Sequence, residues 1–303
     1  MPGDRYIAGI QQQQLTFGFD RQTLAEAERA RYPATPIAEV IGETRHKVRR
    51  IRPPVKAHGG KYYLARQIVP VLLSAPGHPT EYLEPCVYGG SVLLALPRFQ
   101  REIVGDINPD VVQLWRTLAH QELSTLLSQR LNRVSYSEQS FIEVCDATPT
   151  SLVDQAVRFV VKSRFSRGGL GRDFAWSQRQ RGGLPGDENA WNTFREIALP
   201  RIIQRAQGVE VLHDACWWTV WESRREASRL IYADPPYMPQ TRTAKTASGP
   251  FEMTRLQHYW LVAALRAHSG PAAVSGYRCT DYDRWLRDWR RLDFEMPNHS
   301  GQG

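Results

Sequence analysis

Short apolar runs alternate with amphipathic segments along the chain from Lys56 onward. The runs have the length and composition of buried strands, whereas the segments between them carry apolar residues at helical spacing. Strands that alternate with helices favour a parallel sheet, because each helix carries the chain back across it. The pattern therefore predicts an α/β fold, a doubly wound sheet with helices on both faces. The expected strands are 81–84, 102–106, 209–214, 230–233, 271–275 and 291–294, and the expected helices are 62–73, 91–96, 110–118, 253–267 and 280–289.

The same pattern divides the chain into four parts. Residues 1–54 form an N-terminal extension with a glutamine run, a short helical pattern from Asp20 to Tyr32 and a basic run before Pro53. The simplest interpretation is a partly ordered extension, and the alternative is that the basic run contacts DNA phosphates or a partner. The remaining parts are a first core half at 55–134, a mainly helical insertion at 135–204 and a second core half at 205–303.

The strand at 230–233 runs into Asp234-Pro235-Pro236-Tyr237, which brings functional groups to the carboxyl edge of the sheet. The exocyclic amine of a nucleobase is a poor nucleophile, because its lone pair is delocalised into the ring. Asp234 could accept one hydrogen bond from this amine and the Pro235 carbonyl a second, since proline has a fixed φ and no N–H. Tyr237 could stack on the base and favour positive charge on its nitrogen. A string of four such residues also occurs by chance in surface turns.

Two glycine-containing turns precede expected helices. Gly59-Gly60-Lys61 stands before the first of them, where backbone N–H groups and the helix dipole attract a carboxylate or a phosphate. Gly89-Gly90 follows the first expected strand, in the layout of strand, turn and helix that brings a cofactor against a sheet. The spacing therefore predicts a small-molecule site near both turns.

Two further strands end in an acid. Asp106 comes about twenty residues after the second glycine turn, where a carboxylate can accept the ribose hydroxyls of an adenosine-containing cofactor. The alternative for this segment is a helix cap for 110–118, a frequent use of Asn or Asp before a helix. Asp214 ends the next strand and could equally cap a helix that starts near Cys216.

Composition narrows the class of protein. With 303 residues and 42% hydrophobic content, the chain can bury a full core. It has no run of 18 apolar residues and no signal-peptide pattern, which predicts a soluble, cytoplasmic protein without membrane contact. The four cysteines lack metal-ligand spacing, so neither a zinc site nor a disulfide framework is expected. A net charge of +8 fits a polyanionic partner.

The basic charge is concentrated in the insertion, where residues 162–181 hold six basic side chains and a single acid, Asp173. Aromatic rings and glycines lie among them, a combination that suits a surface which neutralises phosphates and stacks on bases. A charge run is often only a solvated face, but this imbalance favours DNA contact. The expected DNA contacts are Arg164, Arg167, Arg172, Arg179 and Arg181, together with Arg242 and Lys245 in the polar loop after Tyr237.

The Asp234-Pro235-Pro236-Tyr237 string resembles the catalytic motif of the Dam-like adenine-N6 DNA methyltransferases, and the resemblance runs from Lys56 to the end of the chain. Gly59-Gly60-Lys61 and the segment from Glu84-Pro85 to Gly90 look like the cofactor motifs of that family. The resemblance implies a Rossmann-like, S-adenosylmethionine-dependent methyltransferase fold with a helical target-recognition insertion. It also implies methylation of adenine N6 in DNA, with the base flipped out of the helix.

The resemblance further implies roles for individual residues. Asp234, Pro235, Pro236 and Tyr237 would be catalytic, and Asp214 would meet the adenine amino group of the cofactor. The cofactor-binding residues would be Gly59, Gly60, Lys61, Glu84, Pro85, Gly89, Gly90, Asp106 and Asp214. The sequence departs from the family pattern at Ala57, Cys86 and Tyr88, where an aromatic residue, a phenylalanine and a glycine are usual, and it ends before a basic loop and strand that relatives usually carry. A narrowed cofactor pocket and a missing terminal piece of the sheet are therefore expected.

Two other functions fit the same residues. One is a DNA-binding protein with a degenerate cofactor pocket, and the other is an enzyme that methylates cytosine N4 or RNA. The aspartate at 234 argues against cytosine, for which serine is more usual. DNA is the expected partner, and the sequence leaves open whether a restriction endonuclease or another defence protein accompanies it.

Overall fold

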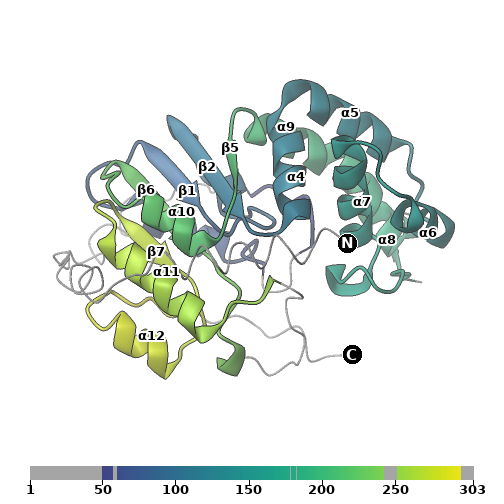
Figure 1. Ribbon diagram of the computed structural model, residues 1–303. Helices are drawn as coiled ribbons and strands as arrows, with labels where there is room; N and C mark the ends of the chain where they lie inside the picture. Colours follow the sequence, from purple (N-terminus) through teal and green to yellow (C-terminus); the bar gives the residue numbers. More distant parts are fainter. Residues whose placement is uncertain (1–49, 57–59, 178, 182, 242–250, 295–303) are drawn as a thin grey trace.

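The chain folds around one parallel sheet with helices on both faces (Figure 1). The computed structural model describes residues 50–56, 60–177, 179–181, 183–241 and 251–294. The helical pattern at Asp20 to Tyr32, together with Gly59, Arg242 and Lys245, lies outside these residues. Within them, no helix is both long and apolar enough to cross a membrane.

Five strands form the sheet in the order β5-β2-β1-β6-β7, and every pair is parallel. Their bounds are β1 Glu81–Glu84, β2 Arg101–Asp106, β5 Glu210–His213, β6 Arg229–Ala233 and β7 Ala272–Val274. Along the chain, β2 and then β5 are added on one side of β1, and β6 and β7 are added afterwards on its other side. Because the strand order reverses between β1 and β6, the crevice at their carboxyl ends is the usual ligand position in such sheets.

Alternate residues of the central strands enter two hydrophobic clusters. Tyr82 and Tyr232 pack on one face, and Leu83 and Ile231 pack on the other. The first face is covered by α3 Ala65–Leu73 and α4 Pro109–Ala119, and the second by α10 Cys216–Glu222 and α11 Arg255–Ala267. Strands buried on both sides read as continuous apolar runs, which is why the sequence indicated them clearly. The expected doubly wound fold is confirmed.

A helical part lies beside the sheet in Figure 1 and shares the larger hydrophobic cluster with it. Helix α7 packs against α4 and α5, so the helices continue the core of the sheet. The limits expected at 54, 134 and 204 remain predictions. The elements of this part are α5 Gln121–Asn132, α6 Glu138–Asp146, α7 Leu152–Arg164, a short hairpin of β3 Gln180–Arg181 and β4 Leu184–Pro185, α8 Gly186–Thr193, a π-helical turn Phe194–Ala198 and α9 Leu199–Ala206.

Three expected elements differ from the structure. The helix expected at 91–96 is a single 3₁₀ turn, Leu93–Ala95, because the buried segment ends after one turn at Leu96, whose backbone is extended. The strand expected at 291–294 is irregular. The last helix, α12 Thr280–Trp285, ends earlier than the expected limit of 289.

Candidate active site at the carboxyl edge of the sheet

Acidic side chains gather at the carboxyl ends of four neighbouring strands. Glu84 ends β1, Asp106 ends β2, and Asp214 and Asp234 directly follow β5 and β6. Parallel pairing brings these ends to one edge, and β1 pairs with both β2 and β6. Glu84 and Asp234 therefore lie on the two sides of the crevice where the strand order reverses.

Asp234 forms an ion pair with Lys61 inside this crevice. The Nζ atom of Lys61 lies 2.7 Å from Oδ1 and 2.8 Å from Oδ2 of Asp234. Burial raises the pKa of Asp234, and the ammonium group of Lys61 draws it part of the way back. Burial alone would lower the pKa of Lys61, but Asp234 and Tyr237 more than offset this, so the pKa lies above its ordinary value. Both groups are therefore held in their charged forms by each other.

The residues after Asp234 lie next to the ion pair. Pro235 is buried, and Pro236 and Tyr237 are half-buried. The Tyr237 ring lies 4.8 Å from Lys61 Nζ and meets the ring of Tyr277 edge-on, with 4.7 Å between the centroids. Next to Tyr277 lies a hollow of about 480 Å³, lined by Gln240, Thr241 and residues 277–281. Sequence reasoning missed Tyr277, because nothing local marks it as a neighbour of Tyr237.

Glu84 is fully enclosed at the end of β1. Its Oε2 atom accepts hydrogen bonds from the Tyr82 hydroxyl at 2.9 Å and from the Leu93 N–H at 3.1 Å. Burial raises the pKa of Glu84 to about 8. The carboxyl group consequently ties β1 to the following 3₁₀ turn and carries a proton at neutral pH.

In the glycine turn after β1, Tyr88 replaces a glycine of the family pattern. Tyr88 has a φ of 37°, in the left-handed region, and its ring packs edge-on against Phe159 of α7. Its carbonyl accepts a hydrogen bond from Trp115 at 2.9 Å. A Cβ atom on Gly90 would lie 2.3 Å from the Trp115 ring, so only glycine fits there. Pro85 and Gly89 belong to the same turn, and Gly89 packs near Val55.

Asp106 organises this turn from the neighbouring strand. Its Oδ2 atom accepts a hydrogen bond from the Tyr88 N–H at 3.0 Å, and its Oδ1 atom accepts one from the Asn108 N–H at 2.9 Å. Burial raises the pKa of Asp106 to about 6. The alternative of an Asn or Asp cap before this helix is confirmed for Asn108, which caps α4, and Asp106 itself is not the cap. Its role toward a ribose stays a prediction.

Asp214 follows β5, and Gly60 precedes the turn that leads into α3. The Asp214 carboxylate is half-buried, and its Oδ1 atom accepts a hydrogen bond from the Ala215 N–H at 2.7 Å. Ala215, one residue later, holds the cap position of α10, and no side chain caps this helix. Gly60 is exposed at the start of the turn that leads into α3.

The basic residues of the insertion do not share one environment. Arg167, Arg172 and Arg179 are exposed, whereas Arg164 is half-buried. Arg164 donates a hydrogen bond to the Pro54 carbonyl at 2.8 Å, and its guanidinium lies 3.5 Å from the centre of the Phe194 ring.

Burial beside Arg52 lowers the pKa of Arg164 to about 9. Arg164 therefore joins the segment before the first glycine turn to α7, and its guanidinium is occupied by these contacts. Arg181 lies in β3, and the structure does not describe its side chain.

Lys56 makes a comparable link that the sequence did not indicate. Its Nζ atom donates to the carbonyl of Arg164 at 2.7 Å and to that of Ser166 at 3.3 Å. A Cβ atom on Gly169 would lie 2.7 Å from the Lys56 carbonyl oxygen, so the two segments touch closely. Lys56, which precedes the first glycine turn, is thus anchored to the insertion.

Comparison with known proteins decides the family. The model of the D12 class N6 adenine-specific DNA methyltransferases matches residues 58–258, which is more than half of the chain. The chain belongs to this family. This methyltransferase is 28% identical over 205 residues to the DNA adenine methylases of two Vibrio cholerae strains, covering 64% of the chain and 68% of each relative. It is 25% identical over 217 residues to the Type II methyltransferase M.MjaIII of Methanocaldococcus jannaschii, covering 65% of the chain and 73% of that relative.

Membership confirms the resemblance, the fold and the enzyme class predicted from the sequence. The chain is an adenine-specific DNA methyltransferase, so its substrate is DNA and its reaction needs a methyl donor. The predicted roles of single residues are not decided by membership and are taken up as proposals.

Proposed function

We propose that this methyltransferase transfers a methyl group from S-adenosylmethionine to N6 of an adenine that has been flipped out of the DNA helix. The observation that carries this proposal is the position of Asp234. Its carboxylate stands at the crevice where the strand order reverses, beside the Tyr237 ring and across from the turn after β1. Flipping the base costs a few kcal/mol, which stacking and hydrogen bonds in the crevice offset.

The residues of the crevice suit an adenosine-containing donor. Gly90 lets the turn after β1 pack directly on the Trp115 ring, and Asp106 holds the backbone of the same turn. We propose that Gly59, Gly60, Glu84, Pro85, Gly89, Gly90 and Asp106 surround the donor and that Asp214 meets its adenine amino group. When bound, the donor supplies an activated methyl group on a sulfonium.

The other residues prepare the amine. Asp234 and the Pro235 carbonyl accept hydrogen bonds from the two N6 hydrogens, which returns the lone pair to the nitrogen. Tyr237 stacks on the base and favours the positive charge that develops during attack. No strong base is required, because the methylated amine is acidic. Positioning the two reactants in line is the main contribution of the chain.

The test is methylation by the purified protein with unmethylated plasmid DNA and labelled S-adenosylmethionine. We expect label in DNA, and mass spectrometry of the digested nucleosides should identify it as N6-methyladenine. Once sequencing of the product gives the modified context, 2-aminopurine placed at the target should brighten on binding, as an unstacked base does. Label on cytosine, or no binding of the donor, would contradict the proposal.

A further inference from the structure

The ion pair between Lys61 and Asp234 joins the first glycine turn to the catalytic motif, 173 positions later in the chain. We propose that Lys61 is a positioning residue for the reaction, one that keeps the Asp234 carboxylate ionised and aimed, and that this is its role in place of a contact with the methyl donor. The inference rests on the proposed function, since it assigns a task to a neighbour of the proposed acceptor.

The geometry supports a dedicated pair. Lys61 Nζ lies within 2.8 Å of both carboxylate oxygens, and the two side chains are only 5% and 20% exposed. Lysine loses much rotamer freedom when it is buried, so a lysine held this firmly needs a specific partner. Lys61 lies at the start of the turn that leads into α3, where its side chain is almost fully buried. Its ammonium group points at Asp234.

The surroundings make the positive charge necessary. Besides Lys61, the titratable groups among the described residues that interact with Asp234 are Glu84 at the end of β1, Cys86 in the glycine turn, Tyr232 on β6 and Tyr237. Each of these groups is neutral in its protonated form. Burial raises the pKa of Asp234 and so favours its protonated form as well. Lys61 is the group that opposes this. Without it, burial would favour the protonated form of the carboxyl group, which has less acceptor capacity.

The pair leaves room for the substrate. An ionised carboxylate has two oxygens with roughly four acceptor positions. Lys61 donates a hydrogen bond to Oδ2 of Asp234, and among the described residues Oδ1 has no hydrogen-bond partner. An adenine amine needs one acceptor position. Lys61 can therefore stay in place while the base binds, and its distance of 4.8 Å from the Tyr237 ring keeps it beside the stacking surface.

The experiment compares Lys61→Met, Lys61→Gln and Lys61→Arg with the wild type. Single-turnover methylation rates are measured from pH 6 to pH 9, and binding of S-adenosylmethionine is measured separately by titration. In a plot of rate against pH, the acid limb is the fall in rate at low pH as Asp234 takes up a proton. In the methionine and glutamine variants, this limb should move to higher pH. If the pKa of Asp234 then lies one unit above the assay pH, only about a tenth of the enzyme is ionised, so the rate at pH 7 should fall roughly 10-fold or more and recover as the pH rises. The arginine variant should keep the limb of the wild type.

Lys56→Met is the matched control, because Lys56 is a half-buried lysine that precedes the same turn and its ammonium group donates to the backbone carbonyls of Arg164 and Ser166. It should lower stability without moving the acid limb. Melting curves identify variants that fail to fold, and the polar, uncharged Lys61→Gln carries the test if Lys61→Met is among them.

The two proposals fail in different ways. If the wild type makes no N6-methyladenine, the proposed function fails. If the wild type is active but Lys61→Met and Lys61→Gln lose affinity for the donor with an unmoved acid limb, Lys61 contacts the donor and this inference is wrong. A rate that drops equally at every pH would also overturn it.

Discussion

Glu84 is a carboxyl group that the fold keeps protonated. Its pKa of about 8 exceeds the ordinary value of 4.5, because burial disfavours the anion. The folded state therefore holds a proton that the unfolded state releases above about pH 4.5. The bound proton therefore favours the folded state. Its contribution to the free energy of unfolding is complete below about pH 4.5, declines by about 1.4 kcal/mol per pH unit above it, and is gone above about pH 8.

Replacing Glu84 with Gln removes this dependence while keeping an acceptor for Tyr82 and Leu93. Between pH 5 and 8, we expect the free energy of unfolding to fall less steeply with pH for the variant than for the wild type. The two slopes should differ by about 1.4 kcal/mol per pH unit. Urea unfolding at several pH values measures both slopes. Parallel curves would show that Glu84 is ionised in the folded protein.

Local chemistry explains which residues could be found from the sequence. Asp234, Pro235 and Tyr237 are adjacent, so their combined chemistry is readable in one string. Lys61, the partner of Asp234, could not be found in this way, because 173 positions separate the two residues and only the fold brings them together. Arg164 shows the opposite problem. A charge run does not reveal which member turns inward, and Arg164 lies on a helix face that meets Pro54 and Phe194.

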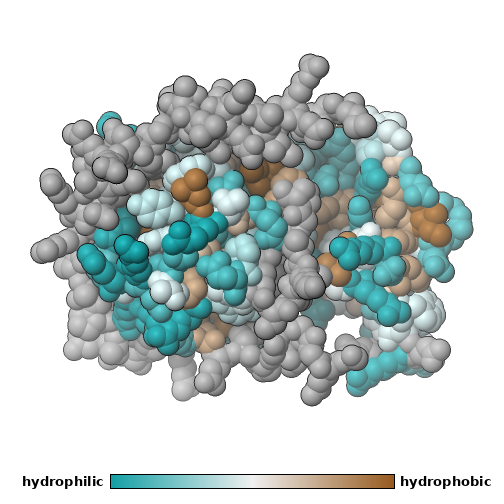
Figure 2. Space-filling model, turned by 60° about the horizontal axis from the view of Figure 1, so that its bottom comes forward, coloured by the Kyte–Doolittle hydropathy of each residue, from teal (hydrophilic) through white to brown (hydrophobic). Residues whose placement is uncertain are grey.

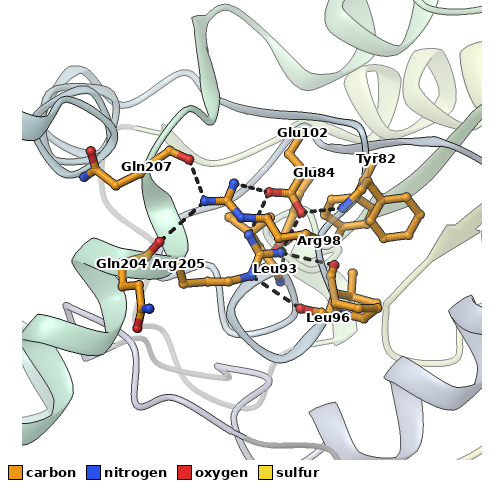
Figure 3. A network of polar contacts seen from close by, with 11 residues as sticks. Tyr82, Glu84, Leu93, Leu96, Arg98, Glu102, Gln204, Arg205 and Gln207 are labelled. Atoms are coloured by element: carbon orange, nitrogen blue, oxygen red, sulfur yellow. Dashed lines mark hydrogen bonds and ion pairs between the residues drawn. The ribbon is translucent and has the colours of Figure 1, made fainter.

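At the scale of elements, a charged cluster fastens α9 to β2 (Figure 3). Arg205 of α9 binds both oxygens of Glu102 at 2.7 Å, and Arg98 binds the same carboxylate at 2.9 Å. Arg98 also donates to the Gln207 carbonyl at 2.6 Å. Glu102 is buried, so removing a partner leaves an uncompensated charge in the core.

Replacing Arg205 with Met should lower the free energy of unfolding by about 3 kcal/mol, the lower end of the range for breaking a buried pair, because Arg98 still binds Glu102. The control is Arg101→Met, because Arg101 lies next to Glu102 on β2. Arg101 and Glu210 form an exposed pair, so the cost should stay below about 1 kcal/mol. Denaturant unfolding of both variants gives the comparison, and equal losses would contradict the structural role of the cluster.

The elements themselves follow from the sequence where burial is complete. The strands β1 and β6 were predicted almost to the residue, since both of their faces are covered. Prediction failed for short pieces. A six-residue apolar segment after the glycine turn cannot distinguish a helix from a 3₁₀ turn, and the irregular stretch at 291–294 has too few apolar residues to fix its pairing.

At the scale of the whole molecule, the net charge is positive, which suits a polyanionic substrate. The formal charge is +8, and hydrophilic side chains predominate among the described residues on the face shown in Figure 2, with hydrophobic ones in small groups. We propose that Arg167, Arg172, Arg179 and Arg181 of the insertion, with Arg242 and Lys245, contact DNA. Arg164 is left out because its contacts are internal.

Replacing Arg167 or Arg172 with Ala should weaken DNA binding similarly across sequences and reduce the slope of log affinity against log salt by about 1 for each phosphate that the variant no longer neutralises. Arg101→Ala is the control, because Arg101 lies at the amino end of β2, at the opposite edge of the sheet from the crevice. Fluorescence anisotropy at several salt concentrations measures the slopes. Unchanged slopes for Arg167 and Arg172 would place the DNA elsewhere.

The most direct test of the account is Asp234→Ala, measured for single-turnover methylation of adenine and, separately, for binding of S-adenosylmethionine. A surface variant, Asp288→Ala, controls for the loss of a carboxylate, and melting curves control for folding. Because the acceptor acts on the amine and not on the donor, we expect the methylation rate to fall roughly 100-fold or more while donor affinity changes only a few-fold. A folded variant with a near-normal rate would contradict the account.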